Sequence, residues 1–222
     1  ARENILTGDD LIQPLFIKED LSGLEAIDQM PGISRFGLDS IEKEIEELMN
    51  LGIKAVALFP VINPNKKDEN GSEAINQNNL ICNAIKNIKS SFPEIIIISD
   101  VALDPYTNHG HDGILVNSYV DNDKTLDQLV KQSVALARSG ADIIAPSDMM
   151  DGRIKAIRSA LEENDFKNTI LLSYAAKYNS KFYGPFRSAV GSSSNLGKSS
   201  KAEYQMDVAN SNEALNEVAL DI

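Results

Sequence analysis

The chain has 222 residues, of which 42% are hydrophobic and 24% are charged, as in ordinary soluble globular proteins. Its 33 acidic and 21 basic residues give a net charge of −12, which disfavours binding to a nucleic-acid backbone or to an anionic membrane surface. The single cysteine, Cys82, excludes an internal disulfide framework and a cysteine-rich zinc site. No apolar run approaches the ~20 residues of a bilayer-spanning helix, and the first residues lack a secretion-signal pattern, so we expect a soluble, cytoplasmic protein.

Short apolar runs alternate along the chain with segments of helical periodicity. The predicted strands are residues 11–17, 53–61, 95–103, 141–146 and 169–175. Pro14 restricts the first of them to an edge or entry strand, because proline has no N–H group to donate to a neighbouring strand. Apolar residues at helical spacing between the strands predict amphipathic helices around residues 41–49, 80–88, 126–137 and 154–161.

Two helix ends carry specific capping predictions. Asp39 is the predicted N-cap of the first helix, with Glu42 three residues later as its capping-box partner. The last helix is expected to begin at about Glu213, after a cap at Ser211 or Asn212. Its predicted inner face consists of Leu215, Val218 and Ile222.

Hydrophobic strands that alternate with amphipathic helices are typical of an α/β fold with a parallel sheet. No glycine-rich dinucleotide loop or Walker loop follows a strand, which disfavours a nucleotide-binding doubly wound sheet. Polar residues instead follow the carboxyl ends of the strands, as in the active site of a (β/α)8 TIM barrel. We therefore predict a single TIM-barrel domain over residues 1–222, with only about five of the eight strands present in this chain.

Lys177 is the first candidate catalytic residue, because it follows the fifth apolar strand in the sequence SYAAKY. A lysine at a strand end of low dielectric loses part of its proton affinity, and its neutral amine can attack a carbonyl carbon to form a Schiff base. The commoner alternative is a surface lysine whose charged end extends into solvent.

The segment SDVALDPYTNHGHDG holds both histidines of the chain, His109 and His111, together with Asp100, Asp104 and Asp112. Imidazole and carboxylate groups at such spacing can hold a divalent metal ion. They can equally form a hydrogen-bonded loop in which the histidines orient neighbouring groups. The sequence leaves both interpretations open.

Residues 188–200 are rich in glycine and serine, and they lie among Arg187, Lys198 and Lys201 in an otherwise acidic chain. This composition predicts a mobile cationic loop above the barrel mouth that can hold a carboxylate substrate. A solvated surface loop is the alternative.

Several long segments resemble the porphobilinogen synthase family, whose members are also called 5-aminolaevulinate dehydratases. The similar segments include QMPGISRF, KKDENGSEA, SDVALDPYTNHGHDG, APSDMMDGRI and SYAAKYNSKFYGPFR. The resemblance implies a TIM barrel and a lyase of tetrapyrrole (haem) biosynthesis. Such an enzyme condenses two molecules of 5-aminolaevulinate into porphobilinogen with release of two water molecules.

The resemblance also assigns roles to individual residues. Lys177 would bind the first substrate molecule as a Schiff base, while Arg187 and Lys201 would hold substrate carboxylate. The other positions that match the family's pocket are Asp100, Ser147, Tyr183, Phe186 and Gln205.

The metal expectations follow from the same resemblance. The zinc-using branch of the family has cysteines at the positions of Ala102, Asp104 and Asp112, so we expect no zinc here. The aspartate-containing branch uses an allosteric magnesium ion, and Glu217 matches its glutamate. A hard cation with mostly water ligands suits such a single carboxylate. Asp104 and Asp112 are candidates for holding a further cation.

The family's second Schiff-base lysine lies on a strand beyond the last residue given, and its N-terminal arm is longer than the one here. We therefore expect these 222 residues alone to be inactive, and we carry over the family's homo-octamer only as an expectation. The alternatives are a class I aldolase-like lyase that uses Lys177 alone and a non-catalytic fragment. We expect a small-molecule substrate and no organic cofactor, nucleic acid or membrane partner.

Overall fold

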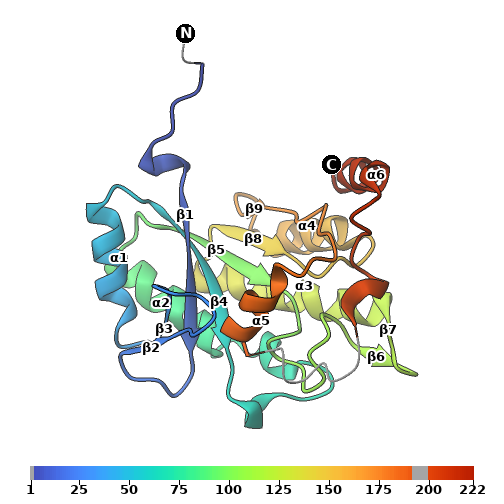
Figure 1. Cartoon of the computed structure of the whole chain (residues 1–222), viewed down its shortest axis with the longest axis horizontal. Coiled ribbons are helices and arrows are strands. Elements are labelled where there is room, and N and C mark those ends of the chain that lie inside the picture. The colour runs from blue at the N-terminus through green and yellow to red at the C-terminus, as the bar shows by residue number, and fades with distance from the viewer. Residues whose placement is uncertain (1–2, 192–199) are drawn as a thin grey trace.

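The computed structural model describes residues 3–191 and 200–222. A seven-stranded sheet with the order β2-β3-β1-β4-β5-β8-β9 forms its centre (Figure 1). The strands are β1 (Ile12–Lys18), β2 (Leu24–Ala26), β3 (Ser34–Phe36), β4 (Ala55–Val61), β5 (Ile96–Val101), β8 (Ile143–Pro146) and β9 (Ile170–Leu171). A separate small hairpin consists of β6 (Leu115–Val116) and β7 (Tyr119–Val120).

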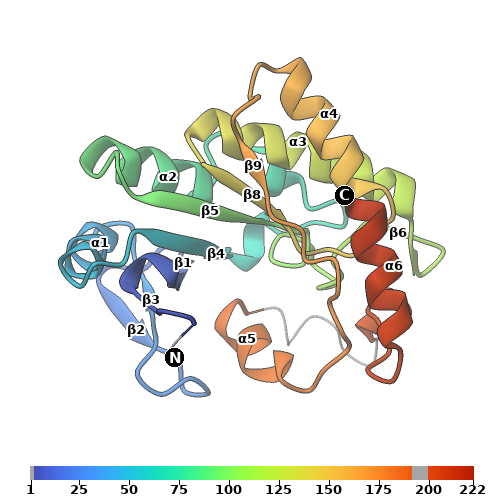
Figure 2. The same cartoon turned by 90° about the horizontal axis from the view of Figure 1, so that it is seen from above.

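Helices cover one face of the sheet more completely than the other. The α-helices are α1 (Ile41–Asn50), α2 (Leu80–Ser91), α3 (Asn122–Ser139), α4 (Arg153–Glu163), α5 (Tyr183–Ala189) and α6 (Ser211–Asp221). Helices α1 to α4 lie along one side of the sheet, whereas α5 lies on the opposite side (Figure 2). The 3-10 turns are η1 (Gly8–Asp10), η2 (Pro64–Lys66), η3 (Ser72–Ile75) and η4 (Lys201–Glu203).

The five predicted strands are the parallel strands β1, β4, β5, β8 and β9, and they neighbour one another in chain order. This arrangement confirms the predicted α/β class with a parallel sheet. Strand β1 is an edge strand only in part. Pro14 faces β4 alone, but Phe16 and Ile17 also pair with β3, so this end of β1 is inside the sheet. Because no described strand pairs with Pro14 on its other side, the missing N–H group of this proline interrupts no ladder of hydrogen bonds there.

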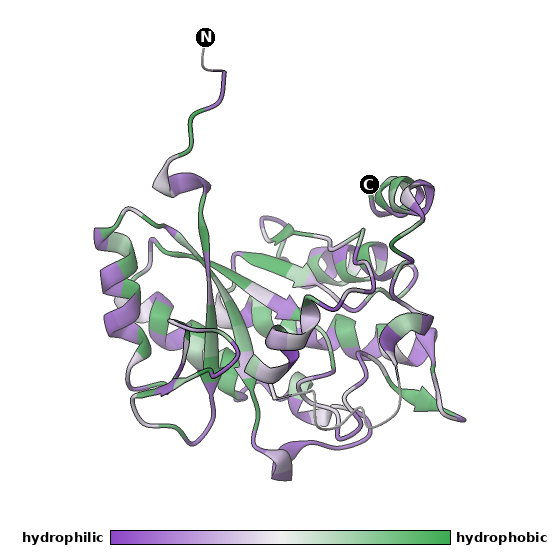
Figure 3. Cartoon of the chain, in the orientation of Figure 1, coloured by the Kyte–Doolittle hydropathy of each residue, from purple (hydrophilic) through white to green (hydrophobic). Residues whose placement is uncertain are grey.

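Alternation along the strands divides the apolar residues between two cores. Leu15, Ile17, Val56 and Leu58 are buried under the helices α1 to α4 with the largest apolar cluster. Their neighbours in sequence face the other side of the sheet, where a smaller cluster contains Ala57, Ile98 and Ala145. Strand β4 is hydrophobic along its length and β5 along its first half, whereas α1 has mixed hydropathy (Figure 3). Both faces of the sheet are therefore apolar, as in a parallel α/β fold.

Both capping predictions are wrong. Ser40 precedes α1, and the Asp39 carboxylate instead accepts hydrogen bonds from Ser22 and from the backbone of Gly23. The side chain of Asn210 caps α6 by accepting from the backbone N–H of Glu213. The predicted inner face of α6 is exposed in the described chain, at 71%, 42% and 100% for Leu215, Val218 and Ile222. Among the described residues, no helix is long and apolar enough to cross a membrane.

Candidate functional site

Asp100 and Ser147 belong to the sheet face that lies opposite helices α1 to α4. Asp100 is in β5 and pairs with Ala145 of β8, and Ser147 directly follows β8. The Ser147 hydroxyl donates a 2.6 Å hydrogen bond to Asp100 Oδ1. Burial raises the pKa of Asp100 to about 7, although Ser147 and Lys177 both act to lower it. Asp100 can therefore exchange a proton near neutral pH.

Lys177 lies beside this pair, in the segment that follows β9. Its ammonium donates to the backbone carbonyl oxygen of Ser147 at 2.5 Å, and its Nζ lies 5.6 Å from the ring centroid of Tyr183. Lys177 is half-buried. Its own carbonyl oxygen accepts a hydrogen bond from the backbone N–H of Met206, which fixes the segment. The amine is thus held at the carboxyl ends of the parallel strands, where we predicted it.

Helix α5 brings three more predicted residues to the same place: Tyr183, Phe186 and Arg187. The Phe186 ring packs edge-on against Phe59, with centroids 5.2 Å apart, and lies 6.0 Å from Phe16. Arg187 is half-buried, and within the described residues it has no ion-pair partner. Its guanidinium is therefore available for an anionic ligand.

Lys201 is buried at 5% exposure rather than carried on an open loop. Its ammonium lies 3.0 Å from Asp104 Oδ2 and 3.0 Å from Asp112 Oδ1. Burial alone would lower the pKa of Lys201, but the two carboxylates raise it above its ordinary value. The cation between Asp104 and Asp112 is thus the lysine, and the pair does not fit a metal site in this arrangement.

All eight residues predicted for catalysis and substrate binding line one narrow cleft. Its lining consists of Phe59, Pro60, Asp100, Asp104, Pro105, Ser147, Lys177, Tyr183, Phe186, Arg187, Val190, Lys201 and Gln205. The free space is about 20 Å³, which is room for little more than a water molecule. The buried Gln205 presents a side-chain oxygen that has no hydrogen-bond partner in the described part of the chain. A second hollow of about 190 Å³ shares six lining residues with this cleft: Phe59, Asp100, Ser147, Lys177, Tyr183 and Phe186. A ligand beside Lys177 would therefore meet both charged and apolar groups.

The histidine loop is a hydrogen-bonded structure, one of the two interpretations that the sequence left open. His109 Nδ1 accepts from the backbone N–H of His111, and His111 Nδ1 lies 3.2 Å from the Tyr204 hydroxyl. The same hydroxyl accepts from the backbone N–H of Asp112. Within residues 3–191 and 200–222, no group of three or more His, Cys, Asp or Glu is arranged to hold a metal ion.

Glu217 lies outside this cleft, in an acidic depression of about 400 Å³ next to α6. Asp151 and Glu213 line the same depression. Partial burial and the charge of Asp151 raise the pKa of Glu217, so a bound cation would relieve repulsion there. One carboxylate with water ligands fits magnesium at this place.

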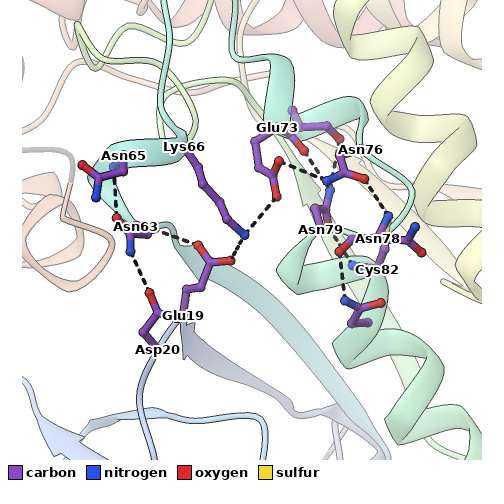
Figure 4. A network of polar contacts seen from close by, with 12 residues as sticks. Glu19, Asp20, Asn63, Asn65, Lys66, Glu73, Asn76, Asn78, Asn79 and Cys82 are labelled. Carbon is purple, nitrogen blue, oxygen red and sulfur yellow. Dashed lines mark hydrogen bonds and ion pairs between the residues drawn. The ribbon is translucent and has the colours of Figure 1, made fainter.

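A second polar cluster closes the loops after β1 and β4 (Figure 4). Lys66 pairs with Glu19 and Glu73, and the backbone N–H of Asn63 donates to Glu19. The Asn79 side chain caps α2 by accepting from the N–H of Cys82. These hydrogen bonds and ion pairs connect the two loops with each other and with η3.

Sequence reasoning missed Phe59 and Tyr204. Phe59 occupies an alternate position in β4, on the face opposite the helices, so strand periodicity could have found it. Tyr204 follows Lys201 by three residues, and no local pattern connects it with a loop 92 residues earlier. The predicted mobile loop 188–200, with Lys198, lies largely outside the described residues.

Known proteins of one family are similar to this chain. The family model described as delta-aminolevulinic acid dehydratase matches residues 1–222. The chain is 52% identical over 222 residues to delta-aminolevulinic acid dehydratase of Bradyrhizobium diazoefficiens, and it covers 63% of that protein. It is 47% identical to the Methanothermus sociabilis protein of the same name, of which it covers 68%.

Solved structures were compared as well, and one example is similar to this chain over almost its whole length. It is delta-aminolevulinic acid dehydratase (porphobilinogen synthase) of Toxoplasma gondii ME49 in complex with the reaction product porphobilinogen. The TM-score is 0.96 at 42% identity, and the alignment covers 99% of this chain and 62% of that one. The chain thus spans about two thirds of the length of the relatives it matches.

The fold and the cleft define a parallel α/β protein with a lysine and a buried carboxyl group at the strand ends. The family model and the similar proteins identify the family, which the fold alone does not. The chain belongs to the delta-aminolevulinic acid dehydratase (porphobilinogen synthase) family of lyases.

Proposed function

We propose that this chain carries the substrate-binding and Schiff-base part of a porphobilinogen synthase, which condenses two molecules of 5-aminolaevulinate. The observation that supports this most directly is the convergence of Lys177, Asp100 and Arg187 on one cleft. In the proposed reaction, the Lys177 amine attacks the ketone carbon of one substrate molecule, and loss of water gives the imine. Asp100, with its pKa near neutrality, can supply or accept the proton that this dehydration moves.

The carboxylate of the substrate needs a cation that no protein carboxylate already occupies. Arg187 meets this condition within the described residues, whereas Lys201 is held by Asp104 and Asp112. We therefore assign Arg187 to substrate carboxylate, with Lys201 as a second contact once the substrate displaces its carboxylate partners. Tyr183, Phe186, Ser147 and Gln205 complete the walls of the pocket.

Members of the family are in general metal-dependent, and for this chain we propose magnesium near Glu217. The acidic depression that Asp151, Glu213 and Glu217 share supports this choice. The test is the shift of melting temperature on adding magnesium. We expect a rise for the unmodified chain and a smaller rise for Glu217→Gln, and an equal rise for both would contradict the assignment. The family's octameric assembly stays a prediction.

Borohydride trapping tests the proposed chemistry. The chain is incubated with 5-aminolaevulinate, reduced with borohydride and mapped by peptide mass spectrometry. We expect a reduced adduct on Lys177, none in Lys177→Arg, and an unchanged adduct in the matched control Lys181→Arg. Lys181 is exposed and only four residues away, so it controls for general lysine reactivity. An adduct on another lysine would refute the assignment, and labelling only by sugar phosphates would favour an aldolase-like lyase.

A further inference from the structure

Helix α5 carries three cleft residues but is too short to be stable alone. It has seven residues, from Tyr183 to Ala189, whereas isolated helices need ~12–15 residues to form in water. Its last carbonyl groups also lack partners within the helix, as at every helix C-terminus. The position of Arg187 at the cleft therefore depends on what holds α5 from outside.

Arg35 of β3 binds the C-terminal end of α5. Its Nε donates to the carbonyl oxygen of Ala189 at 2.8 Å, and its Nη2 donates to that of Ser188 at 2.7 Å. The Arg35 side chain is only 16% exposed. The Ser188 carbonyl oxygen also accepts from the backbone N–H of Gly191 at 3.3 Å, whereas among the described residues the Ala189 carbonyl oxygen accepts from Arg35 alone. The guanidinium thus caps this end of α5 and interacts favourably with the helix dipole.

The orientation of Arg35 is itself fixed. Glu25 is its cross-strand partner in β2, and Glu25 Oε1 accepts from Arg35 Nη1 at 2.5 Å. The other oxygen of Glu25 accepts from Lys18 at the end of β1. The hydrogen bond from Lys18 is the largest cause of the lowered pKa of Glu25, and Arg35 adds to it, so this carboxylate remains charged. The guanidinium thus has all three of its nitrogens in use.

The strand register adds an apolar contact beside this polar one. Arg35 lies directly opposite Phe16 of β1, and the Phe16 ring contacts Phe186 of α5. Phe186 lies three residues before Ala189, about one helical turn. Two neighbouring strands therefore hold α5 at two successive turns, and Arg187 lies between these contacts in the sequence.

We propose that Arg35 is a positioning residue for the cleft: by capping α5 it fixes the Arg187 guanidinium where a ligand carboxylate binds. This rests on the proposed function, because it assumes that Arg187 holds the substrate carboxylate. Arg35 does not line the cleft, so it acts on affinity for the carboxylate and leaves the chemistry of Lys177 unchanged.

The test compares two ketones in the trapping experiment, levulinate and its neutral methyl ester. Loss of both hydrogen bonds in Arg35→Met should raise the half-saturating concentration of levulinate about tenfold. The trapping rate at saturation and the trapping of the methyl ester should stay within about twofold. Arg35→Lys, which can still donate one of the two bonds, should be intermediate. The matched control is Arg138→Met on α3, which removes an exposed arginine whose side chain donates a hydrogen bond to Asn164.

Three results would overturn the proposal. The first is an unchanged half-saturating concentration of levulinate in Arg35→Met. The second is an equal rise of the half-saturating concentrations of levulinate and of its methyl ester. The third is a change of the trapping rate at saturation with no change of the half-saturating concentration. If Arg35→Met does not fold by circular dichroism, wild-type saturation in Arg35→Lys counts against the proposal in the same way. If neither ketone labels Lys177 in the unmodified chain, the proposed function fails instead. Amide exchange over residues 183–191 then decides the capping role, since faster exchange in Arg35→Lys supports it and unchanged exchange refutes it.

Discussion

The burial of Asp100 makes the stability of the folded chain depend on pH. Burial raises its pKa in the folded chain to about 7, whereas in the unfolded chain it would ionise near its ordinary value of about 4. Between these two values the folded chain binds more protons than the unfolded one. The contribution of Asp100 to stability is therefore lost as the pH rises through this window.

The variant Asp100→Asn removes this proton uptake. We expect its melting temperature to fall less than that of the unmodified chain between about pH 5 and about pH 8. Burial also raises the pKa of Asp148, to about 6. Asp148 therefore adds a smaller pH dependence of the melting temperature in both the unmodified chain and Asp100→Asn. The exposed Asp165→Asn is the control and should match the unmodified chain. A pH dependence in Asp100→Asn identical to that of the unmodified chain would show that Asp100 is not the group responsible.

Lys201 should matter as much for stability as for binding. Its removal leaves the carboxylates of Asp104 and Asp112 buried together without a cation. Lys201→Met should therefore lower the free energy of unfolding by ~3–5 kcal/mol, measured by urea denaturation. Lys43→Met, which removes an exposed ion pair with Glu47, should cost less than ~1 kcal/mol. If Lys201→Met and Lys43→Met have the same free energy of unfolding, Asp104 and Asp112 are not buried as charged carboxylates.

At the scale of elements, α6 depends on very few contacts. Asp221 accepts a hydrogen bond from Ser173 and lies 3.7 Å from the guanidinium of the buried Arg153, and α6 itself has no buried residue. We expect Asp221→Asn to speed amide exchange across residues 211–222 without changing exchange in α3. Asn216→Ala, an exposed change on the same helix, should leave the exchange rates unchanged. Slow exchange of α6 in Asp221→Asn would show that other contacts hold this helix.

The elements that the sequence predicted well are those whose buried residues are mostly apolar and regularly spaced. Strands β4, β5 and β8 and helix α2 have largely apolar buried faces, so periodicity was sufficient. Helix α3 was predicted as well, although its buried face includes Gln128, Gln132 and Ser133. The β2–β3 hairpin was missed because its strands have three residues each, too few to show a period. The apolar face of α6 was predicted to be buried, but no described element packs against it.

At the scale of the whole molecule, the sheet ends in an edge strand. In the part of the chain that the structure describes, β9 pairs only with β8, and its Ile170 is 57% exposed. An exposed apolar edge favours self-association. Ile170→Lys should therefore lower the concentration-dependent increase in apparent mass measured by light scattering. Leu51→Lys, which changes an exposed leucine away from the sheet edges, should have no such effect. If Ile170→Lys associates like the unmodified chain, the edge is not the contact.

The residues of the cleft were easier to predict than the contacts that hold them in place. The polar residues that follow strands could be placed at one sheet edge from the parallel topology, and Arg187 was a candidate from the basic composition of its segment. The family resemblance added Tyr183, Phe186 and Gln205. The ion pairs of Lys201 and the contact of Arg35 with α5 could not be predicted. They join residues about 90 to 154 positions apart, and only the folded chain brings them together.

The proposed function depends on imine formation between Lys177 and a 4-oxo acid in this cleft. The most direct measurement is carbon NMR of 5-aminolaevulinate labelled at its ketone carbon and mixed with the chain. We predict a bound resonance at an imine shift that is absent with Lys177→Met and retained with Lys181→Met. A bound ketone resonance alone, or an imine resonance that survives in Lys177→Met, would contradict the account.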